Sequence, residues 1–256
     1  MPHKPRRYLV VGGVDLFDRW GLAVTDEFTL SPPEPKTYQI DVPGADGCID
    51  LTEALAGDVS FSNRTQTFRL LYCGGEVGFE QVKTALSNFL HGRAFAYTLS
   101  WDPGYTYTGR FSVDEYASSL AYGTVSLTVD AEPYKLRQHK TVRVAAAGGT
   151  VAVLECGRKR QSPRVTCSRE CVVTWDEGSV RLQAGSWSVP GLWITEGDNE
   201  VYVNSDLTGG DLTLGDWWGD ALSEVAGKRL SELMWSVKPA DTDAGAVYFD
   251  YDVMDL

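Results

Sequence analysis

Residue types that serve metal centres and nucleophilic catalysis are scarce in this 256-residue chain. It contains 3 His and 5 Cys, and the histidines lie far apart in the sequence, at His3, His91 and His139. The odd number of cysteines and their irregular spacing indicate reduced thiols with structural roles, not a disulfide framework. Cys167 and Cys171 are spaced like half of a metal site, but no second pair or nearby His completes four ligands. We therefore predict no metal and no cofactor.

Motifs that carry catalysis are also absent. The sequence has no nucleophile elbow, no P-loop and no paired metal-binding histidines. Gly12-Gly13 follows an expected strand, but neither a G-x-G-x-x-G pattern nor a helix is expected after it. Carboxylates are plentiful, yet capping explains Asp50 and Glu53, and a turn explains Asp102. We predict that the protein is not an enzyme, with a glycosidase that uses two carboxylates as a rival hypothesis.

The chain lacks long apolar runs and an excess of positive charge. No apolar run approaches the ~20 residues needed to cross a bilayer, and the basic N-terminus has no signal-peptide core. We expect a protein without membrane insertion that is made and kept soluble in a cytoplasm, or that enters a particle assembled there. The formal net charge of −12 argues against nonspecific binding to a nucleic-acid backbone. Residues 200–256 hold 12 Asp/Glu against 3 Lys/Arg, which indicates a solvated acidic surface, a docking face or a channel lining that repels DNA.

The most informative stretch of the chain is Phe79–Arg110. Its first part has apolar residues at helical spacing, and Gly92 can take the left-handed conformation that ends the helix. His91 can then bond the last helix carbonyls and complement the helix dipole. The period next switches to two, which predicts a strand, a turn at Asp102–Gly104 and a return strand closing on Gly109-Arg110. The apolar residues expected on one face of the helix or of the first strand are Phe79, Val82, Leu86, Phe89, Leu90, Phe95, Tyr97, Leu99 and Trp101.

The remainder of the first half is expected to be mainly strands joined by turns. Ser31–Pro35 should break regular structure, and Pro43–Gly57 reads as a loop or hairpin tip with a helical turn at Glu53–Leu55. Pro133 and the charged run up to Lys140 predict a boundary, and therefore a first domain over residues 1–140. Further strands are predicted at Tyr8–Val11, Leu22–Leu30, Tyr38–Ile40, Val59–Phe61, Thr67–Tyr72 and Val125–Val129.

The second half, residues 141–256, has many short strands with turn signals between them. This pattern is typical of a β-sandwich. Trp217–Trp235 is expected to form a late helical insertion, and Val247–Tyr251 a final strand. The other predicted strands are Val142–Val144, Val151–Val153, Arg164–Thr166, Val172–Trp175, Val180–Leu182, Leu192–Ile194 and Val201–Val203.

Three blocks in the first half carry a resemblance to a known family. They are Pro43-Gly44-x-Asp46-Gly47-x-Ile49-Asp50-Leu51-Thr52 running into Asn63-Arg64; Leu90-His91-Gly92 with Asp102-Pro103-Gly104-Tyr105 and Tyr107-x-Gly109-Arg110; and Asp130-Ala131-x-Pro133-Tyr134-Lys135. In their order and spacing, the chain resembles the distal tail proteins of long-tailed, noncontractile bacteriophages. The resemblance implies a mainly β fold with a few helices. In that fold a ring-forming β-barrel or sheet domain with a packed helix precedes a galectin-like β-sandwich.

The resemblance also implies a structural role in the virion, at the tail tip, after assembly in the host cytoplasm. Such proteins form a ring, usually a hexamer, that joins the tail tube to the tip or baseplate and the adsorption apparatus. The implied partners are the tube protein, a tail-associated tip protein and a receptor-binding or fibre protein, while DNA passes through without specific binding. The residues expected at ring or tube interfaces are Pro43, Gly44, Asp46, Gly47, Arg64, Tyr105 and Arg110.

In the family, the second domain is chiefly a docking platform. Trp193, Trp217 and Trp218 are expected to serve docking or to stack on sugars. Leu192–Val203 looks like the edge-turn-strand pattern of that sandwich, although no contiguous trio of polar sugar ligands is present. The alternative function is therefore a carbohydrate-binding adapter module of a tail or cell-surface protein.

Overall fold

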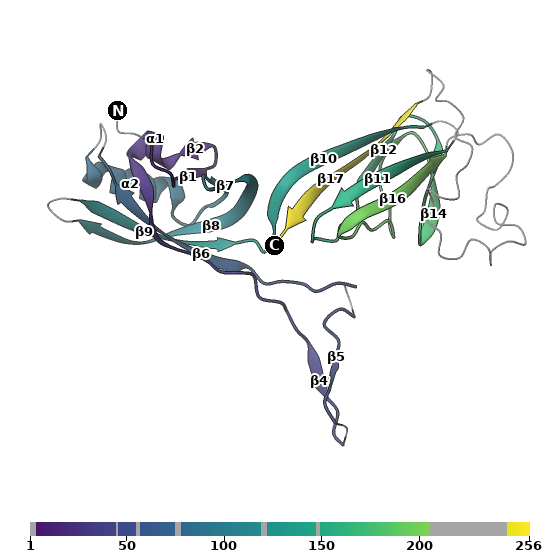
Figure 1. Ribbon diagram of the computed structural model, residues 1–256, viewed down its shortest axis with the longest axis horizontal. Coiled ribbons are helices and arrows are strands. Elements are labelled where there is room, and N and C mark those ends of the chain that lie inside the picture. The colour runs from purple at the N-terminus through teal and green to yellow at the C-terminus, as the bar shows by residue number, and fades with distance from the viewer. Residues whose placement is uncertain are drawn as a thin grey trace, which may run out of the picture. The chain divides into compact units, whose positions relative to one another are not determined.

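A computed structural model describes residues 4–44, 46–54, 57–74, 78–118, 122–146, 149–204 and 245–256. The chain divides into two compact units (Figure 1). Unit 1 runs to Arg137 and also includes Asp255 and Leu256, and unit 2 is Gln138–Met254. The last two residues thus lie with unit 1, where a second domain over 141–256 would not place them. The Arg137 Nε and Nη2 atoms both donate to Asp255 Oδ2, at 2.9 and 2.6 Å, and hold that end of the chain.

The largest sheet of unit 1 is antiparallel and curled. Strand β8 pairs with β7 along its first half and with β9 along its second half, so one long strand belongs to both sides of the curl. The sheet's two ends approach each other where the Val24 N–H donates to the Arg7 carbonyl at 3.0 Å. In spatial order the strands are β3 (Leu22–Leu30), β6 (Arg64–Tyr72), β9 (Gly123–Ala131), β8 (Asp102–Ser118), β7 (Ala94–Leu99), β1 (Leu9–Val11) and β2 (Val14–Asp15).

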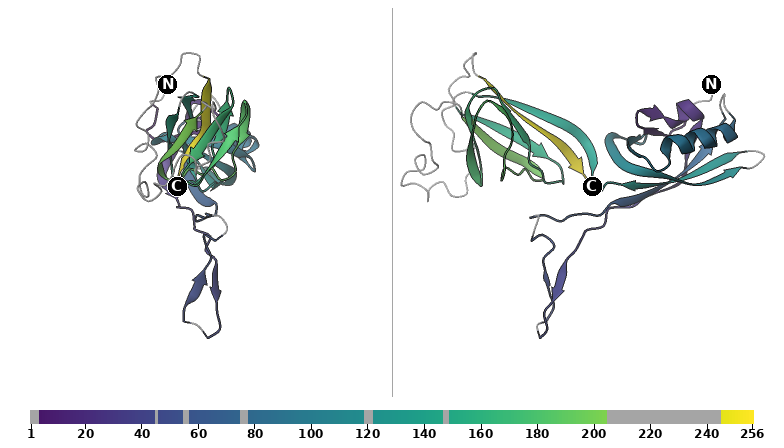
Figure 2. Two further views of the ribbon diagram at one scale, coloured as in Figure 1. Left: turned by 90° about the vertical axis from the view of Figure 1, so that its right-hand side faces the viewer. Right: turned by 180° about the vertical axis from the view of Figure 1, so that it is seen from behind.

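The predicted helix forms as α2 (Phe79–Leu90) and packs on the curled sheet (Figure 2). Val82, Leu86 and Leu90 are completely buried because the i, i+4 spacing places them on one face. Gly92 has φ of 75° and ends the helix as expected. The prediction for His91 was wrong. Its Nδ1 accepts a hydrogen bond from the Val113 N–H at 3.1 Å, because the long β8 strand runs past the end of the helix.

Polar contacts hold aromatic side chains in the core of unit 1. Tyr97 stacks on Tyr107 with 5.5 Å between ring centroids and meets Phe111 edge-on at 5.1 Å. The Tyr97 hydroxyl donates to Gln66 Oε1 at 2.8 Å, so neither buried polar group lacks a partner. Phe68 is also buried in this cluster.

The turn between β7 and β8 differs from the prediction. It lies at Ser100 and Trp101, where the Ser100 hydroxyl accepts from the Tyr8 N–H and donates to the Arg6 carbonyl, both at 2.9 Å. Asp102–Gly104 instead begins β8, in an irregular stretch between the Leu99–Asp102 and Thr98–Thr106 pairs. A proline without an N–H is tolerated in such a bulge. The return strand also continues past Arg110 to Ser118.

Three further predictions for the first half need correction. A short helix, α1 (Leu16–Trp20), does follow Gly12-Gly13, and Asp15 caps it by accepting from two backbone N–H groups. Val59–Phe61 is not a strand but makes a single bridge, from Phe61 to Pro35. The boundary predicted near residue 140 falls inside a strand, because residues 135–140 belong to β10 (Lys135–Ala145).

Unit 2 is a sandwich of two layers with four strands each, which share one apolar core. Phe249 and Val173, one from each sheet, are completely buried in it. The first sheet, in spatial order, contains β15 (Gly185–Ser188), β12 (Arg164–Cys167), β17 (Ala246–Asp255) and β10. The second contains β11 (Thr150–Cys156), β16 (Gly197–Asn204), β13 (Cys171–Trp175) and β14 (Gly178–Leu182).

Most predicted strands of unit 2 are present, and the mainly β fold class is confirmed. Leu192–Ile194 was predicted as a strand but forms only one bridge, between Ile194 and Gln161. Strand β15 was not predicted, and Gly197–Asn199 belongs to β16 instead of a turn before it. The predicted helical insertion Trp217–Trp235 lies outside the described residues.

The packing of α2 predicts that Leu86→Ala destabilises unit 1 by about 2–5 kcal/mol, because it leaves a cavity under a completely buried side chain. The matched control is Thr84→Ala, on the exposed face of the same helix, which should change the free energy of unfolding by no more than about 0.5 kcal/mol. Denaturant unfolding followed by near-ultraviolet circular dichroism measures both. Equal losses in the two variants would contradict the observed helix orientation.

The close packing of Gly109 on β8 against β9 predicts that Gly109→Ala also destabilises unit 1, by roughly 1–3 kcal/mol. A Cβ at Gly109 would lie 2.7 Å from Val129 Cγ1 and 2.9 Å from the Asp130 carbonyl oxygen. Gly104 lies on the same strand with no atom within 4 Å of its added Cβ, so Gly104→Ala is the control and should be nearly neutral. Thermal unfolding of the two variants tests the difference, and similar melting temperatures would refute it.

Candidate functional site

An extended hairpin leaves the curled sheet of unit 1 between β3 and β6. We call residues 36–60 the arm; its root is the bridge between Pro35 and Phe61, flanked by the hydrogen bond from the Lys36 N–H to the Ser60 carbonyl at 2.8 Å. The arm contains β4 (Gln39–Asp41) and β5 (Cys48–Asp50), which pair with each other. All described residues from Lys36 to Asp50 are exposed, and the ribbon extends away from the curled sheet (Figures 1 and 2).

The arm is amphipathic, and its apolar face has no cover. Ile40 lies opposite Ile49 in the register, so both side chains lie on one face, and Tyr38 and Val42 continue the same alternation beyond the ends of β4. Their exposures are 62% for Tyr38, 38% for Ile40, 39% for Val42 and 53% for Ile49. The opposite face carries Gln39, Asp41, Cys48 and Asp50. Although the hairpin tip was expected from its turn residues, this apolar face was not, and the alternation Tyr38-x-Ile40-x-Val42 was the available signal.

The tip of the arm contains four of the predicted interface residues. Gly44 and Gly47 have φ of 87° and 79°, a backbone that L side chains rarely adopt, and no atom lies within 4 Å of a Cβ added at either glycine. Pro43 and Asp46 are exposed beside them. The tip is therefore a tight turn that presents Asp46 to the surroundings.

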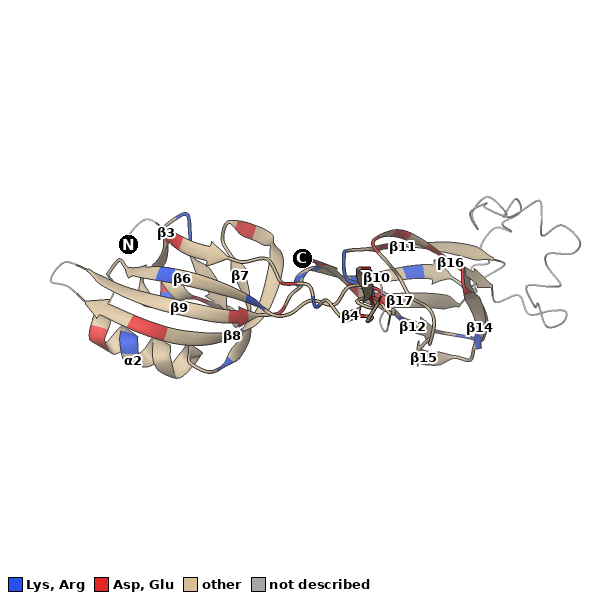
Figure 3. Ribbon diagram, turned by 90° about the horizontal axis from the view of Figure 1, so that it is seen from below, with Lys and Arg blue, Asp and Glu red and all other residues tan. Residues whose placement is uncertain are grey.

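Apart from Lys36 at its start, the arm carries only negative charge. Between Thr37 and Asn63 the sequence has no Lys, Arg or His, and the acidic residues there are Asp41, Asp46, Asp50, Glu53 and Asp58. Asp50 accepts from the Thr52 N–H at 2.9 Å, and hydrogen bonding to Thr52 lowers the pKa of this carboxyl. Elsewhere in unit 1 acidic and basic side chains are interspersed, as Figure 3 shows for α2 and the long strands. The acidic arm thus differs in charge from the body that carries it.

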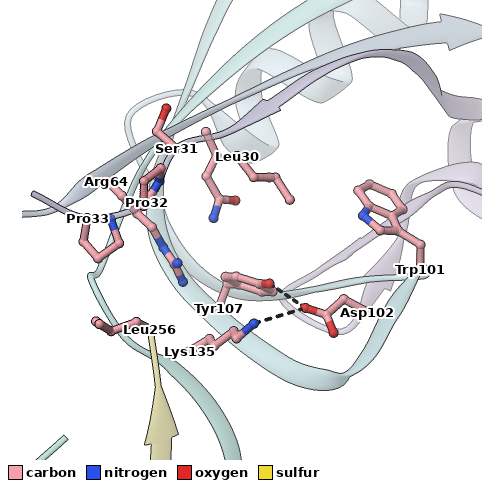
Figure 4. A pocket seen from close by; sticks show the side chains of 11 residues that line it. Leu30, Ser31, Pro32, Pro33, Arg64, Trp101, Asp102, Tyr107, Lys135 and Leu256 are labelled. Carbon is pink, nitrogen blue, oxygen red and sulfur yellow. Dashed lines mark hydrogen bonds and ion pairs between the residues drawn. The ribbon is translucent and has the colours of Figure 1, made fainter. Parts of the chain in front are cut away.

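A pocket of about 530 Å³ lies in unit 1 at the root of the arm (Figure 4). It is bordered by the chain that enters the arm, by the first residue of β6, and by the start of β8. The lining residues are Leu30, Ser31, Pro32, Pro33, Arg64, Gln66, Trp101, Asp102, Tyr107, Lys135 and Leu256.

Arg64 is the unusual member of this pocket. Only 8% of the residue is exposed, and its Nε and Nη2 atoms are buried without a hydrogen-bond partner. Its guanidinium carbon lies 5.2 Å from the centroid of the Tyr107 ring, and no carboxylate in the described residues is within ion-pair distance of it. Burial lowers the pKa of Arg64 because the charged form loses its hydration. The pocket therefore holds a cation that unit 1 leaves without an anion.

The nearby carboxylate is already engaged. Asp102 Oδ2 accepts from the Tyr107 hydroxyl at 2.6 Å and lies 3.7 Å from Lys135 Nζ (Figure 4). Burial, and then this hydrogen bond to Asp102, raises the pKa of Tyr107 far above its ordinary value, so Tyr107 stays neutral. The Lys135 Nζ also lies 4.0 Å from the ring centroid of Tyr105. The negative charge of Asp102 is thus paired with Lys135, while the positive charge of Arg64 has no carboxylate paired with it among the described residues.

The other predicted site residues are spread over the molecule. Arg110 donates to the Gly92 carbonyl at 2.6 Å and so fixes the end of α2. Trp193, 46% exposed, has the Arg160 guanidinium 4.7 Å from its ring centroid, so one ring face is already covered. Trp217 and Trp218 lie outside the described residues. Of the predicted interface residues, Arg64 lines the pocket and Tyr105 contacts Lys135, which also lines it. Pro43, Gly44, Asp46 and Gly47 lie together at the arm tip, and Arg110 lies at the end of α2.

Cysteines and carboxylates do not assemble a metal centre in the described part of the chain. None of the five cysteines, all of which lie in the described residues, forms a disulfide, and Cys156, Cys167 and Cys171 are buried in unit 2. The Cys171 thiol lies 3.3 Å from the Cys167 sulfur, which is hydrogen-bond distance for sulfur. Cys48 and Cys73 are exposed, so the expectation of structural roles does not hold for these two. Among the described residues, no helix is long and apolar enough to cross a membrane.

Comparison with solved structures identifies a protein with a similar fold. No protein-family model and no curated protein matches the sequence. Among solved structures, the chain is similar to the crystal structure of the Dit protein of phage SPP1, described as a paradigm of the hub adsorption apparatus in phages that infect Gram-positive bacteria. The identity is 16% and the TM-score 0.54, over 96% of this chain and 98% of that one. The fold predicted from the resemblance to distal tail proteins is thereby confirmed: this chain has a Dit-like fold.

Proposed function

We propose that this protein is a structural component of a phage tail, in which copies of unit 1 assemble through the arm into a ring of six. The observation that carries the proposal is the exposed apolar face of the arm in a chain with a Dit-like fold. The ring joins the tail tube to the tail tip or baseplate and the adsorption apparatus. The protein acts in the virion, after assembly in the host cytoplasm, and its role is structural instead of catalytic.

The apolar face of the arm suits contact with another protein surface. A two-stranded hairpin alone is marginally stable in water, and this one exposes four large apolar side chains on one face. Such patches mark interaction sites, and open strand edges favour pairing with another chain. A contact between the arm of one copy and a different surface of the next is heterologous, and heterologous contacts close into rings when the rotation allows.

The remaining partners follow from the family resemblance. The ring contacts the tube protein on one side and a tail-associated tip protein on the other, and unit 2 provides the docking surface for a receptor-binding or fibre protein. DNA passes through the ring without specific binding. The net charge of −12 suits that role, since like charges reduce adhesion to a polyanion.

Carbohydrate binding by unit 2 is the alternative function. The half-exposed rings of Trp187 and Trp193, with exposures of 41% and 46%, favour it because exposed indole rings can stack on sugars. The Arg160 guanidinium over Trp193 leaves less of that ring for stacking. This alternative predicts a monomer whose tryptophan fluorescence changes when glycans are added.

The ring hypothesis predicts a solution mass of six chains, each of 28.1 kDa, or a smaller form that closes in the presence of tail partners. Light scattering coupled to size-exclusion chromatography gives the mass, and negative-stain imaging shows whether the particles are rings. A chain that stays monomeric with and without tail proteins, and that binds glycans tightly, would contradict the proposal in favour of the adapter.

The arm's role predicts that Ile40→Ser combined with Ile49→Ser weakens assembly without unfolding the protomer. Burial of one such side chain contributes about 1.5–3 kcal/mol, so the pair should raise the ring's dissociation constant by roughly 100-fold or more. The melting temperature of the protomer should hardly change because both side chains are already exposed. The matched control, Gln39→Ser with Cys48→Ser, alters the opposite face of the same hairpin. Sedimentation equilibrium compares the two, and equal effects would rule out docking through the apolar face.

A further inference from the structure

We propose that the pocket at the root of the arm is a carboxylate receptor, and that the Asp46 carboxylate at the arm tip of a second copy occupies it beside Arg64. This inference rests on the proposed ring and identifies the ionic contact that orders it. Tyr107 and Pro33 form part of the receptor wall, and the acidic arm supplies the anion.

The chemistry of the receptor requires an anion. A guanidinium removed from water costs several kilocalories per mole unless an opposite charge and hydrogen-bond acceptors replace the lost hydration. In the free protomer Arg64 receives only the face of the Tyr107 ring, at 5.2 Å, while its Nε and Nη2 have no acceptor. Asp102 does not supply the charge, because it is bound to Tyr107 and Lys135. Arg64 is therefore in a less favourable state before assembly than after an anion arrives.

The choice of a carboxylate from a second copy comes from charge complementarity. The residues from Thr37 to Asn63, which include all of the arm except Lys36, hold five acidic residues and no Lys, Arg or His. Its own root lies close to Arg64 in the chain, yet the arm extends away from the curled sheet (Figures 1 and 2), so its tip lies away from its own root. The arm tip of a neighbouring copy is not held away from this pocket by the length of its own hairpin.

The reach of the arm fits this arrangement. From Pro35 at the root to Gly44 at the tip the hairpin spans nine residue steps, or about 30 Å at roughly 3.3 Å per residue. That length is also about the diameter of a small domain. Equivalent points of adjacent copies in a ring are separated by about one domain diameter. An arm that starts at the root of one copy thus ends near the root of the next, where the receptor lies.

Among the acidic residues of the arm, Asp46 has the best position. Asp41 lies on the face opposite Ile40 and Ile49, so it faces away from a surface that covers the apolar side. Asp50 shares that opposite face and is already bonded to the Thr52 N–H. Asp46 stands between Gly44 and Gly47 at the tip and is exposed.

The experiment measures assembly of the full chain by sedimentation equilibrium for Arg64→Met, Asp46→Asn and the double variant. Each single change should weaken assembly by about 30-fold or more, since truncating one partner leaves the other charge buried and unpaired. The double variant should be little weaker than either single variant, because one interaction is lost only once. The Arg64→Met protomer should melt at the same temperature as the natural protein or higher, because it no longer buries an unpaired cation.

Matched controls separate this contact from general effects of charge. Arg6→Met removes an exposed cation of unit 1, and Asp41→Asn removes a carboxylate from the opposite face of the arm; both should assemble like the natural protein. Arg64→Lys is a second variant at the receptor that keeps the charge and loses the planar fork, and it should also weaken assembly. Because Asp46 is exposed, Asp46→Asn tests the proposal even if the changes at Arg64 disturb folding.

Each other outcome overturns the inference in a distinguishable way. Assembly that is unaffected by Arg64→Met overturns the receptor and leaves the ring intact. Weakening by Arg64→Met without weakening by Asp46→Asn, or strictly additive losses, overturns the assignment of Asp46. If free acetate or inorganic phosphate raises the melting temperature of the natural protein while assembly ignores both variants, the pocket binds small anions instead. A natural protein that remains monomeric at every concentration and with tail partners contradicts the ring itself.

Discussion

The structure of unit 1 depends on one row of residues where β8 passes from one neighbour to the other. Arg64, Ala131 and Gly109 lie side by side across β6, β9 and β8, and Gly109 also faces Phe95 on β7. Because Gly109 has no side chain, its backbone packs directly against Ala131 and Val129, and the sheet can curl there. The curl encloses the stacked rings of the core. The same row fixes the backbone of Arg64 and hence the position from which the arm leaves.

The proposed site follows from this constraint. Since Arg64 is held in the sheet ladder, its side chain lies over Tyr107 and is largely withdrawn from water. The arm ends at Ser60, shortly before this residue, so the acidic segment and the buried cation are neighbours in the chain while the tip of the arm extends away from the curled sheet. An extended hairpin cannot bring the carboxylate at its tip to the Arg64 guanidinium at its own root. The proposed partner of that guanidinium is therefore the carboxylate of a neighbouring copy. In the proposed ring, assembly would be directional because the carboxylate lies at the tip of the arm and the receptor at its root.

The sequence predicts the local elements of this fold better than the site. Helical spacing from Phe79 to Leu90 and the glycine at 92 are local signals, and the helix and its end are where they predict. The turn at Ser100 was missed because its stability comes from hydrogen bonds to Arg6 and Tyr8, over ninety positions earlier. Arg64 was predicted at an interface from the family resemblance. Its burial was not predictable, since it depends on the pairing of β6 with β9 and on the ring of Tyr107.

Electrostatics explains why such a receptor would matter in this protein. Copies that each carry a formal charge of −12 repel one another, and apolar contact alone does not select one orientation of approach. A single unpaired guanidinium in a pocket favours the approach that brings a carboxylate to it and disfavours those that leave it buried and alone. In the proposed ring, the apolar face of the arm would supply affinity and Arg64 would fix the orientation, so that the same contact could repeat from copy to copy. Repetition of one heterologous step with a fixed rotation is the condition under which a chain of subunits closes into a ring.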